Sequence, residues 1–87
     1  MTLEELYRAS LAKWGADGQY DQAVEECAEL ITALKHHRRG KSDDAAVIAE
    51  LADVTLMVGQ LTWMFGEENV RRAVAEKRAK LERLLAG

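Results

Sequence analysis

The sequence of 87 residues has no proline and a single cysteine. One cysteine, Cys27, excludes an intrachain disulfide and gives no sign of a thiolate metal site. Without proline, no residue lacks the backbone donor that a helix needs. The alternation of apolar and polar residues that is typical of strands is also missing, whereas Ala, Leu and Glu are abundant. These features favour an all-α fold.

Long apolar segments are missing as well. The first ten residues, MTLEELYRAS, are amphipathic and acidic, so we expect no signal peptide. Residues 54–66 are fewer than the ~20 apolar residues that span a bilayer, and Asp53 prevents their extension. We therefore expect a soluble, cytoplasmic protein that does not enter membranes.

Charge is unevenly distributed along the chain. The formal net charge is −3, but residues 1–68 contain thirteen acidic and six basic side chains, whereas residues 69–87 contain two acidic and six basic ones. The sequence pI of about 5.3 argues against a nucleic-acid-binding domain. The simplest interpretation of the asymmetry is two solvated faces that attract each other.

Periodicity and capping residues predict four helices, at residues 2–14, 19–37, 42–65 and 67–86. Thr2 and Glu5 form a capping-box pattern, Ser42-Asp43-Asp44 supplies a cap for the third segment, and glycines follow the first three segments. The connections are short, so we expect a four-helix antiparallel bundle in one domain, residues 1–87. The core of so short a chain is small, which favours assembly into a homo-oligomer.

Two carboxylates interrupt the apolar third segment. Between residues 45 and 66 the only charged side chains are Glu50 and Asp53, three residues apart. At ~100° per residue, Glu50 falls at the centre of the apolar stripe that Val54, Met57 and Leu61 form. A lone buried carboxylate costs several kcal/mol, roughly, unless a cation or hydrogen bonds compensate. Glu50 therefore needs a partner.

Two kinds of partner fit the sequence. A lysine of the last segment, Lys77 or Lys80, would form a buried salt bridge, although one lysine explains one acid more easily than two. A metal ion is the alternative, because Glu26 and Glu29 repeat the spacing of Glu50 and Asp53 on the second segment. Residues three apart share a helix face, so two facing helices would present four carboxylates to one point. Taken alone, however, the second segment would place its acids in water.

The ligand set would select the ion. It offers oxygen donors only, which favours Mg²⁺, or Mn²⁺, over zinc and iron. Mg²⁺ commonly binds through a few carboxylates together with substrate phosphates. The basic last segment then gains a role, because Lys77, Lys80 and Arg83 could neutralise phosphate oxygens.

The pattern Glu25-Glu26-Cys-Ala-Glu29, then Glu50-Leu-Ala-Asp53, resembles the signature of the MazG-like all-α nucleoside triphosphate pyrophosphohydrolases, especially short single-domain phage and bacterial members. The resemblance covers residues 19–83. It implies Mg²⁺-dependent cleavage of nucleoside triphosphates between the α and β phosphates, in a homodimer or homotetramer. Its carried-over metal ligands are Glu26, Glu29, Glu50 and Asp53.

The resemblance also implies further roles. Glu25 would hold another metal or orient the attacking water, and the basic cluster that binds substrate corresponds to Lys77, Lys80 and Arg83. The Asn that often precedes this cluster in the family is absent here, which leaves the phosphate contacts open.

Other functions stay open at this stage. The chain could be a non-catalytic helical module that binds a partner protein or its own copy, with the acids paired to basic side chains of a neighbour. It could also bind metal and nucleotide as a sensor without catalysis. Single side chains give weaker hints: Trp14 or Trp63 could stack on a base, and Gln19, Gln22 or the basic turn at residues 38–41 could contact a nucleotide, although core, surface or helix-dipole roles are more common for such residues.

Overall fold

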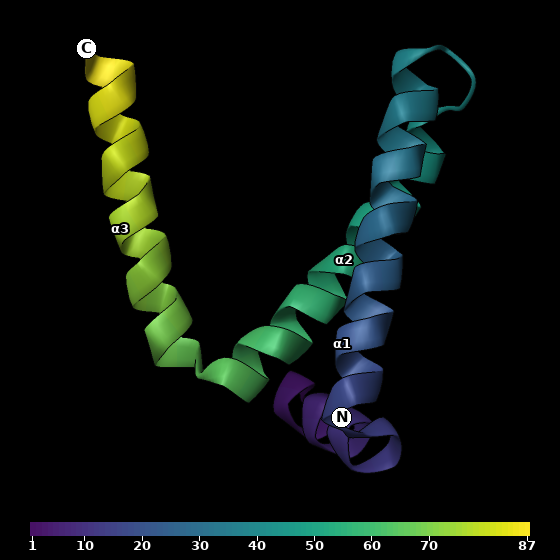
Figure 1. Ribbon diagram of the computed structural model, residues 1–87, viewed down its shortest axis with the longest axis vertical. Helices are drawn as coiled ribbons and strands as arrows, with labels where there is room; N and C mark the ends of the chain where they lie inside the picture. Colours follow the sequence, from purple (N-terminus) through teal and green to yellow (C-terminus); the bar gives the residue numbers. More distant parts are fainter.

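The computed structural model describes all 87 residues as three helices and no strand: α1 (Leu3–Arg38), α2 (Asp44–Phe65) and α3 (Glu67–Ala86) (Figure 1). The all-α prediction is confirmed. α1 and α2 pack against each other, and α3 extends away from both.

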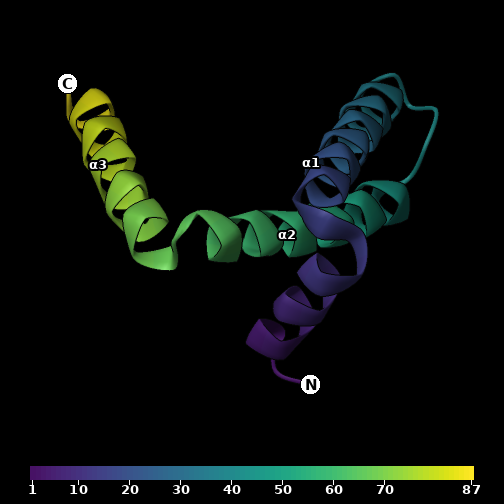
Figure 2. The same ribbon diagram turned by 60° about the horizontal axis from the view of Figure 1, so that its bottom comes forward.

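Helix α1 is bent at Gly15. This glycine has φ 76° and ψ 169°, so the helix consists of two pieces, residues 3–14 and residues 16–38. We call them the N-terminal segment and the long segment of α1. The positive φ is one that L side chains rarely adopt, which explains why glycine occupies the bend. Figure 2 shows the N-terminal segment (purple) leaving the line of the long segment at this point. The predicted break is confirmed, although the two pieces count as one helix.

The predicted caps are formed. Thr2 Oγ1 accepts a hydrogen bond from the Glu5 backbone N–H at 3.1 Å and donates one to Glu5 Oε1 at 3.1 Å. At the start of α2, the Asp43 carboxylate accepts from the Ala46 N–H at 3.2 Å. These side chains satisfy backbone donors that the first turns of the helices leave free.

The interior lies where three pieces of chain cross. The N-terminal segment of α1 contributes Tyr7, the long segment contributes Gln19 and Ala23, and α2 contributes Gln60. These four are the only buried residues. Gln60 Nε2 donates to the Tyr7 carbonyl at 2.9 Å, which fixes the N-terminal segment across α2.

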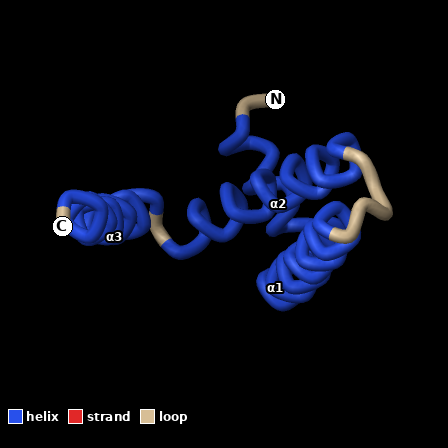
Figure 3. The backbone as a smooth tube through the Cα atoms, turned by 90° about the horizontal axis from the view of Figure 1, so that it is seen from above, coloured by secondary structure: helices blue, strands red, loops and turns tan.

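Helix α3 departs from the predicted arrangement. It contacts α2 near their junction and does not contact α1, and Figure 3 shows it standing apart from the α1–α2 pair. Only Gly66, with φ 112° and ψ 108°, separates α2 from α3. Antiparallel helix pairs are joined by about 2–5 residues, and a single residue does not let α3 turn back along α2. The prediction of a four-helix antiparallel bundle within one chain is therefore wrong.

The apolar part of α2 is longer than the run at residues 54–66 that the sequence indicated. Its 22 residues are long and apolar enough to cross a membrane by length and composition alone. The core helix of a soluble protein passes the same test but is mostly buried, whereas this segment is 6% buried within one chain. That the chain stays out of membranes is therefore still a prediction.

Candidate metal centre

Four carboxylates meet between α1 and α2. Each offers an oxygen, and these oxygens all lie within 4.8 Å of one another. Two come from the long segment of α1 and two from α2, and they are the predicted set: Glu26, Glu29, Glu50 and Asp53. The two i, i+3 pairs do face each other as the sequence predicted.

The face of α1 that meets α2 is the polar one. Gln19, Ala23 and Glu26 follow one another at helical spacing, and all three are buried or half-buried. The apolar arc on the other side of this helix is left in solvent, with Val24 70% exposed and Ile31 56% exposed. Its amphipathic pattern alone would predict that α1 packs against α2 through the apolar arc.

Two of the carboxylate oxygens are buried without a partner. They are Oε2 of Glu26 and Oε2 of Glu50, and neither receives a hydrogen bond. Oε1 of Glu26 accepts a bond from Gln22 Nε2 at 2.8 Å. Buried acceptors that receive nothing are uncommon and call for an unseen donor or cation.

No basic side chain of the chain fills that role. The ion pairs of the structure are all on the surface, and none involves the four carboxylates: Arg8–Glu4, His37–Asp44, Arg71–Glu68 and Arg78–Glu82. The alternative of a buried salt bridge to Lys77 or Lys80 within one chain is therefore not formed.

Crowding changes the acidity of the two α1 carboxylates. Burial raises the pKa of Glu26 above its usual 4.5, and the nearby charges of Glu29 and Asp53 add to this, against a hydrogen bond from Gln22 that lowers it. Glu29 is exposed overall, but loss of hydration beside the other carboxylates raises its pKa, and the charges of Glu50 and Glu25 raise it further. Negative charge at this point is thus unfavourable without a cation.

A groove of about 490 Å³ runs beside the cluster. Glu25 lines it together with Glu29 and Glu50. Ser42, from the turn between α1 and α2, also lines it, and its hydroxyl oxygen is buried without a partner. The sequence indicated Ser42 only as part of a helix cap. Nothing in its local pattern shows that the turn folds back over the acids.

The predicted phosphate-binding residues are not brought to this centre. Lys77, Lys80 and Arg83 lie on α3, which diverges from the α1–α2 pair (Figure 1). None of the three forms an ion pair. The carboxylate half of the predicted site is assembled in one chain, and the basic half is not.

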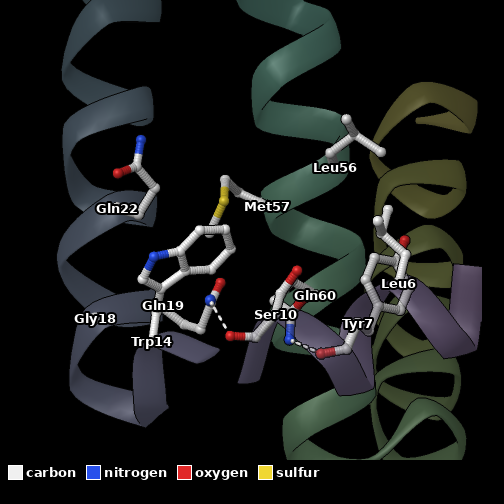
Figure 4. A pocket seen from close by; sticks show the side chains of 10 residues that line it. All are labelled: Leu6, Tyr7, Ser10, Trp14, Gly18, Gln19, Gln22, Leu56, Met57 and Gln60. Carbon is white, nitrogen blue, oxygen red and sulfur yellow. Dashed lines mark hydrogen bonds between the residues drawn. The ribbon is translucent and has the colours of Figure 1, made fainter. Parts of the chain in front are cut away.

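A second hollow, of about 370 Å³, lies next to the carboxylates on the side of the N-terminal segment. Trp14, Met57 and Leu56 provide apolar walls, and Figure 4 shows the indole ring beside Met57, with Leu56 on the far side of the hollow. Gln22 lines this hollow and also donates to Glu26, so its amide joins the hollow to the carboxylate cluster. Trp63, by contrast, does not line it and lies under the Arg8 guanidinium, 5.8 Å from its ring centre.

Two glutamine amides form the floor of this hollow. Gln19 Nε2 donates to the Ser10 carbonyl at 3.3 Å, and Gln60 Nε2 donates to the Tyr7 carbonyl at 2.9 Å (Figure 4). Both side chains are therefore held in place by the N-terminal segment. The two glutamines that the sequence indicated as candidates for nucleotide contact, Gln19 and Gln22, both line the hollow.

No known family model, curated protein or solved structure matches this chain. The resemblance to the MazG-like hydrolases therefore depends on the two acidic motifs and on their meeting in space.

Proposed function

We propose that the chain is a Mg²⁺-dependent nucleoside triphosphate pyrophosphohydrolase of the MazG-like kind, active as a homo-oligomer. The observation that supports it most is the meeting of four carboxylates from two helices, two of whose oxygens are buried and unpartnered. A stability role is a poor explanation for this arrangement, because the acids repel one another and no cation within the same molecule offsets them.

The donor set fits a hard divalent cation. All four groups offer oxygen, and the spread of 4.8 Å is close to the ~4 Å between oxygens on opposite sides of a Mg²⁺ ion. Glu26, Glu29, Glu50 and Asp53 would hold the ion, and Mn²⁺ is the natural substitute. Bound there, it would supply positive charge that polarises phosphate oxygens and acidifies water.

The remaining groups have separate tasks. Glu25 lines the groove beside Glu29 without belonging to the four-carboxylate cluster, and we assign to it the role of taking a proton from the attacking water. The hollow lined by Trp14 and Gln22 is within the ~300–1,000 Å³ range of ligand pockets and is apolar with a few amides. It suits the nucleoside end of the substrate, with the triphosphate over the carboxylates.

A non-catalytic helical assembly module is the second candidate. The observation that favours it is the large apolar surface left in solvent, on Ile31, Ile48 and Leu84 among others. This function predicts association without nucleotide turnover. A metal- and nucleotide-binding sensor is the intermediate case, with binding but no product.

The test is release of pyrophosphate from a panel of ribo- and deoxynucleoside triphosphates, with Mg²⁺ and with a chelator. We expect Mg²⁺-dependent release that Glu50→Gln abolishes and that Glu76→Gln, an exposed α3 carboxylate, retains. Nucleotide binding without pyrophosphate release would favour the sensor function. If a folded, oligomeric protein shows neither nucleotide binding nor pyrophosphate release, the assembly-module function is favoured.

A further inference from the structure

The chain exposes far more surface than a folded protein of its mass. Its accessible surface is 6816 Å² at 9.7 kDa, whereas a compact monomer of this mass exposes about 5,100 Å². The radius of gyration is 15.7 Å, against about 12 Å for a compact domain of this length. The excess, about 1,700 Å², exceeds the ~800 Å² that each partner buries in a standard protein interface.

Part of this surface is the outer side of α2. Ile48, Leu51 and Val58 share a helix face at spacings of three and seven, about 80–160° around the helix from Glu50. All three are exposed, at 63%, 47% and 54%. A helix that is apolar on both sides is normally surrounded by protein. In one chain, only the side toward α1 is covered.

The other part is one stripe of α3. Val70, Val74, Leu81 and Leu84 recur at spacings of four, seven and three, which places them on one face. Val74 and Leu84 are 58% and 68% exposed. Lys77 falls inside the same stripe, three residues after Val74 and four before Leu81. It is a cation in an apolar stripe, as Glu50 is an anion in one.

Charge and connectivity show where this stripe can dock. Residues 1–66, which include α1 and α2, carry a formal charge of −5, and α3 carries +2, so α3 is attracted to the α1–α2 pair. The single residue Gly66 between α2 and α3 prevents α3 from folding back on its own α2. The complementary surface that α3 can reach belongs to another molecule.

We propose that two copies of this chain associate by exchanging α3. The stripe of each α3 packs on the α1–α2 pair of the other copy, and Lys77 faces the four carboxylates there. This placement sets Lys77 beside the centre whose oxygens on Glu26 and Glu50 lack a partner within one chain, where its charge adds to that of a bound ion and does not replace it. It also brings the basic residues of α3 to the centre that they do not reach in one chain. The exchange does not require catalysis, so it can hold whether or not the proposed function does.

Disulfide trapping between two different molecules tests the exchange without nucleotide. In a Cys27→Ser background, Ala49→Cys marks the groove beside Glu29 and Glu50, and Lys77→Cys marks the α3 stripe. We expect the two variants, once mixed and oxidised, to form a covalent heterodimer. Ala79→Cys is the matched control, because it is ~200° around the helix from residue 77 and should cross-link far less.

Other cross-linking results would overturn the exchange. Equal yields from Lys77→Cys and Ala79→Cys would mean random collision. A disulfide that forms only within one molecule, when Ala49→Cys and Lys77→Cys are combined in the same chain, would mean that α3 folds back in cis. No cross-link in a protein that sediments as a single chain would exclude association.

Sedimentation provides the second measurement. We expect the unmodified protein to sediment at twice the 9.7 kDa of one chain, or a multiple of that. Leu81→Asp, within the α3 stripe, should return it to the mass of one chain, while Ala79→Asp should not. Neither residue belongs to the buried interior, so circular dichroism should show that both variants remain helical. A Leu81→Asp protein that keeps its oligomeric mass would contradict the exchange.

Discussion

Gln22 Nε2 donates a hydrogen bond to Glu26 Oε1 over 2.8 Å, one helical turn apart. The same glutamine lines the apolar hollow on one side, and Glu26 belongs to the carboxylate cluster on the other. The bond leaves the second oxygen of Glu26 buried and without a partner. Gln22 thus orients one carboxylate toward the centre while leaving it short of positive charge.

A divalent cation should stabilise the fold through this centre. We expect Mg²⁺ or Mn²⁺ to raise the melting temperature, because the ion binds the folded arrangement of four carboxylates and not the unfolded chain. A concentration of about 100 times Kd corresponds to about 2.7 kcal/mol of stabilisation. Thermal unfolding followed by circular dichroism measures the effect. Glu50→Gln should remove it and Glu76→Gln should keep it, whereas equal shifts in both variants would indicate non-specific binding.

Lowering the pH toward 4.5 should increase the stability of the metal-free fold, whereas it would decrease the stability that a salt-bridged acid provides. The pKa values of Glu26 and Glu29 are raised above 4.5 in the folded chain. Between 4.5 and the raised values, the folded state therefore binds more protons than the unfolded state, and its stability falls as pH rises. The contribution of these two groups is least favourable at neutral pH and is relieved as pH falls toward 4.5.

The matching variant carries Glu26→Gln and Glu29→Gln. In chelator, we expect it to be more stable than the wild type at neutral pH, and the difference should shrink as pH falls toward 4.5. Chemical denaturation at a series of pH values measures this difference. A difference that stays constant with pH, or that grows as pH falls, would show that the two carboxylates are not crowded.

Gly59 allows Tyr7 to approach α2 closely. A Cβ at position 59 would overlap the Tyr7 hydroxyl and lie 2.8 Å from Cζ of the ring. Overpacking of this kind costs ~1–3 kcal/mol, while replacing a helical glycine with alanine gains about 1 kcal/mol. Because the overlap is severe and Tyr7 is buried, we expect Gly59→Ala to lower the free energy of unfolding. Adding Tyr7→Phe should recover part of the loss, and full stability of Gly59→Ala alone would contradict the close approach.

Gln60 connects α2 to the N-terminal segment of α1. It is 3% exposed, and its amide donates to the Tyr7 carbonyl at 2.9 Å. Gln60→Leu keeps the approximate volume and removes this bond, so we expect a loss of about 1 kcal/mol in urea denaturation. Gln22→Leu, which changes an exposed glutamine, should cost less. An equal cost for both would mean that the bond at Gln60 does not hold the segment in place.

Local features of the fold could be predicted from the sequence because each has a local cause. Thr2 and Asp43 cap helices by bonding backbone donors three residues on, and Gly15 and Gly66 mark the bend and the end where φ is positive. The cluster could also be anticipated, since Glu50 falls inside an apolar stripe and a carboxylate there needs a compensating partner.

Tertiary features could not be predicted in the same way. The apolar arc containing Val24 and Ile31 is stronger than the polar side of α1, yet it is the polar side that meets α2. Amphipathicity predicts which face a helix buries, and it does not distinguish a face buried within one chain from a face left for something else. The position of α3 was missed for a related reason: helix periodicity predicts the stripe, whereas the one-residue junction at Gly66 decides the direction.

The bend at Gly15 has a consequence for how the molecule opens. As a straight helix, the 36 residues of α1 would extend about 54 Å, yet the longest dimension of the molecule is 39 Å. The bend turns the N-terminal segment across α2, and each of the two hydrogen bonds that anchor it comes from a buried glutamine. Local detachment of these first residues would therefore expose three of the four buried side chains at once, namely Tyr7, Gln19 and Gln60. Amide exchange in residues 3–14 should accordingly report the opening of the whole α1–α2 pair rather than fraying of a chain end.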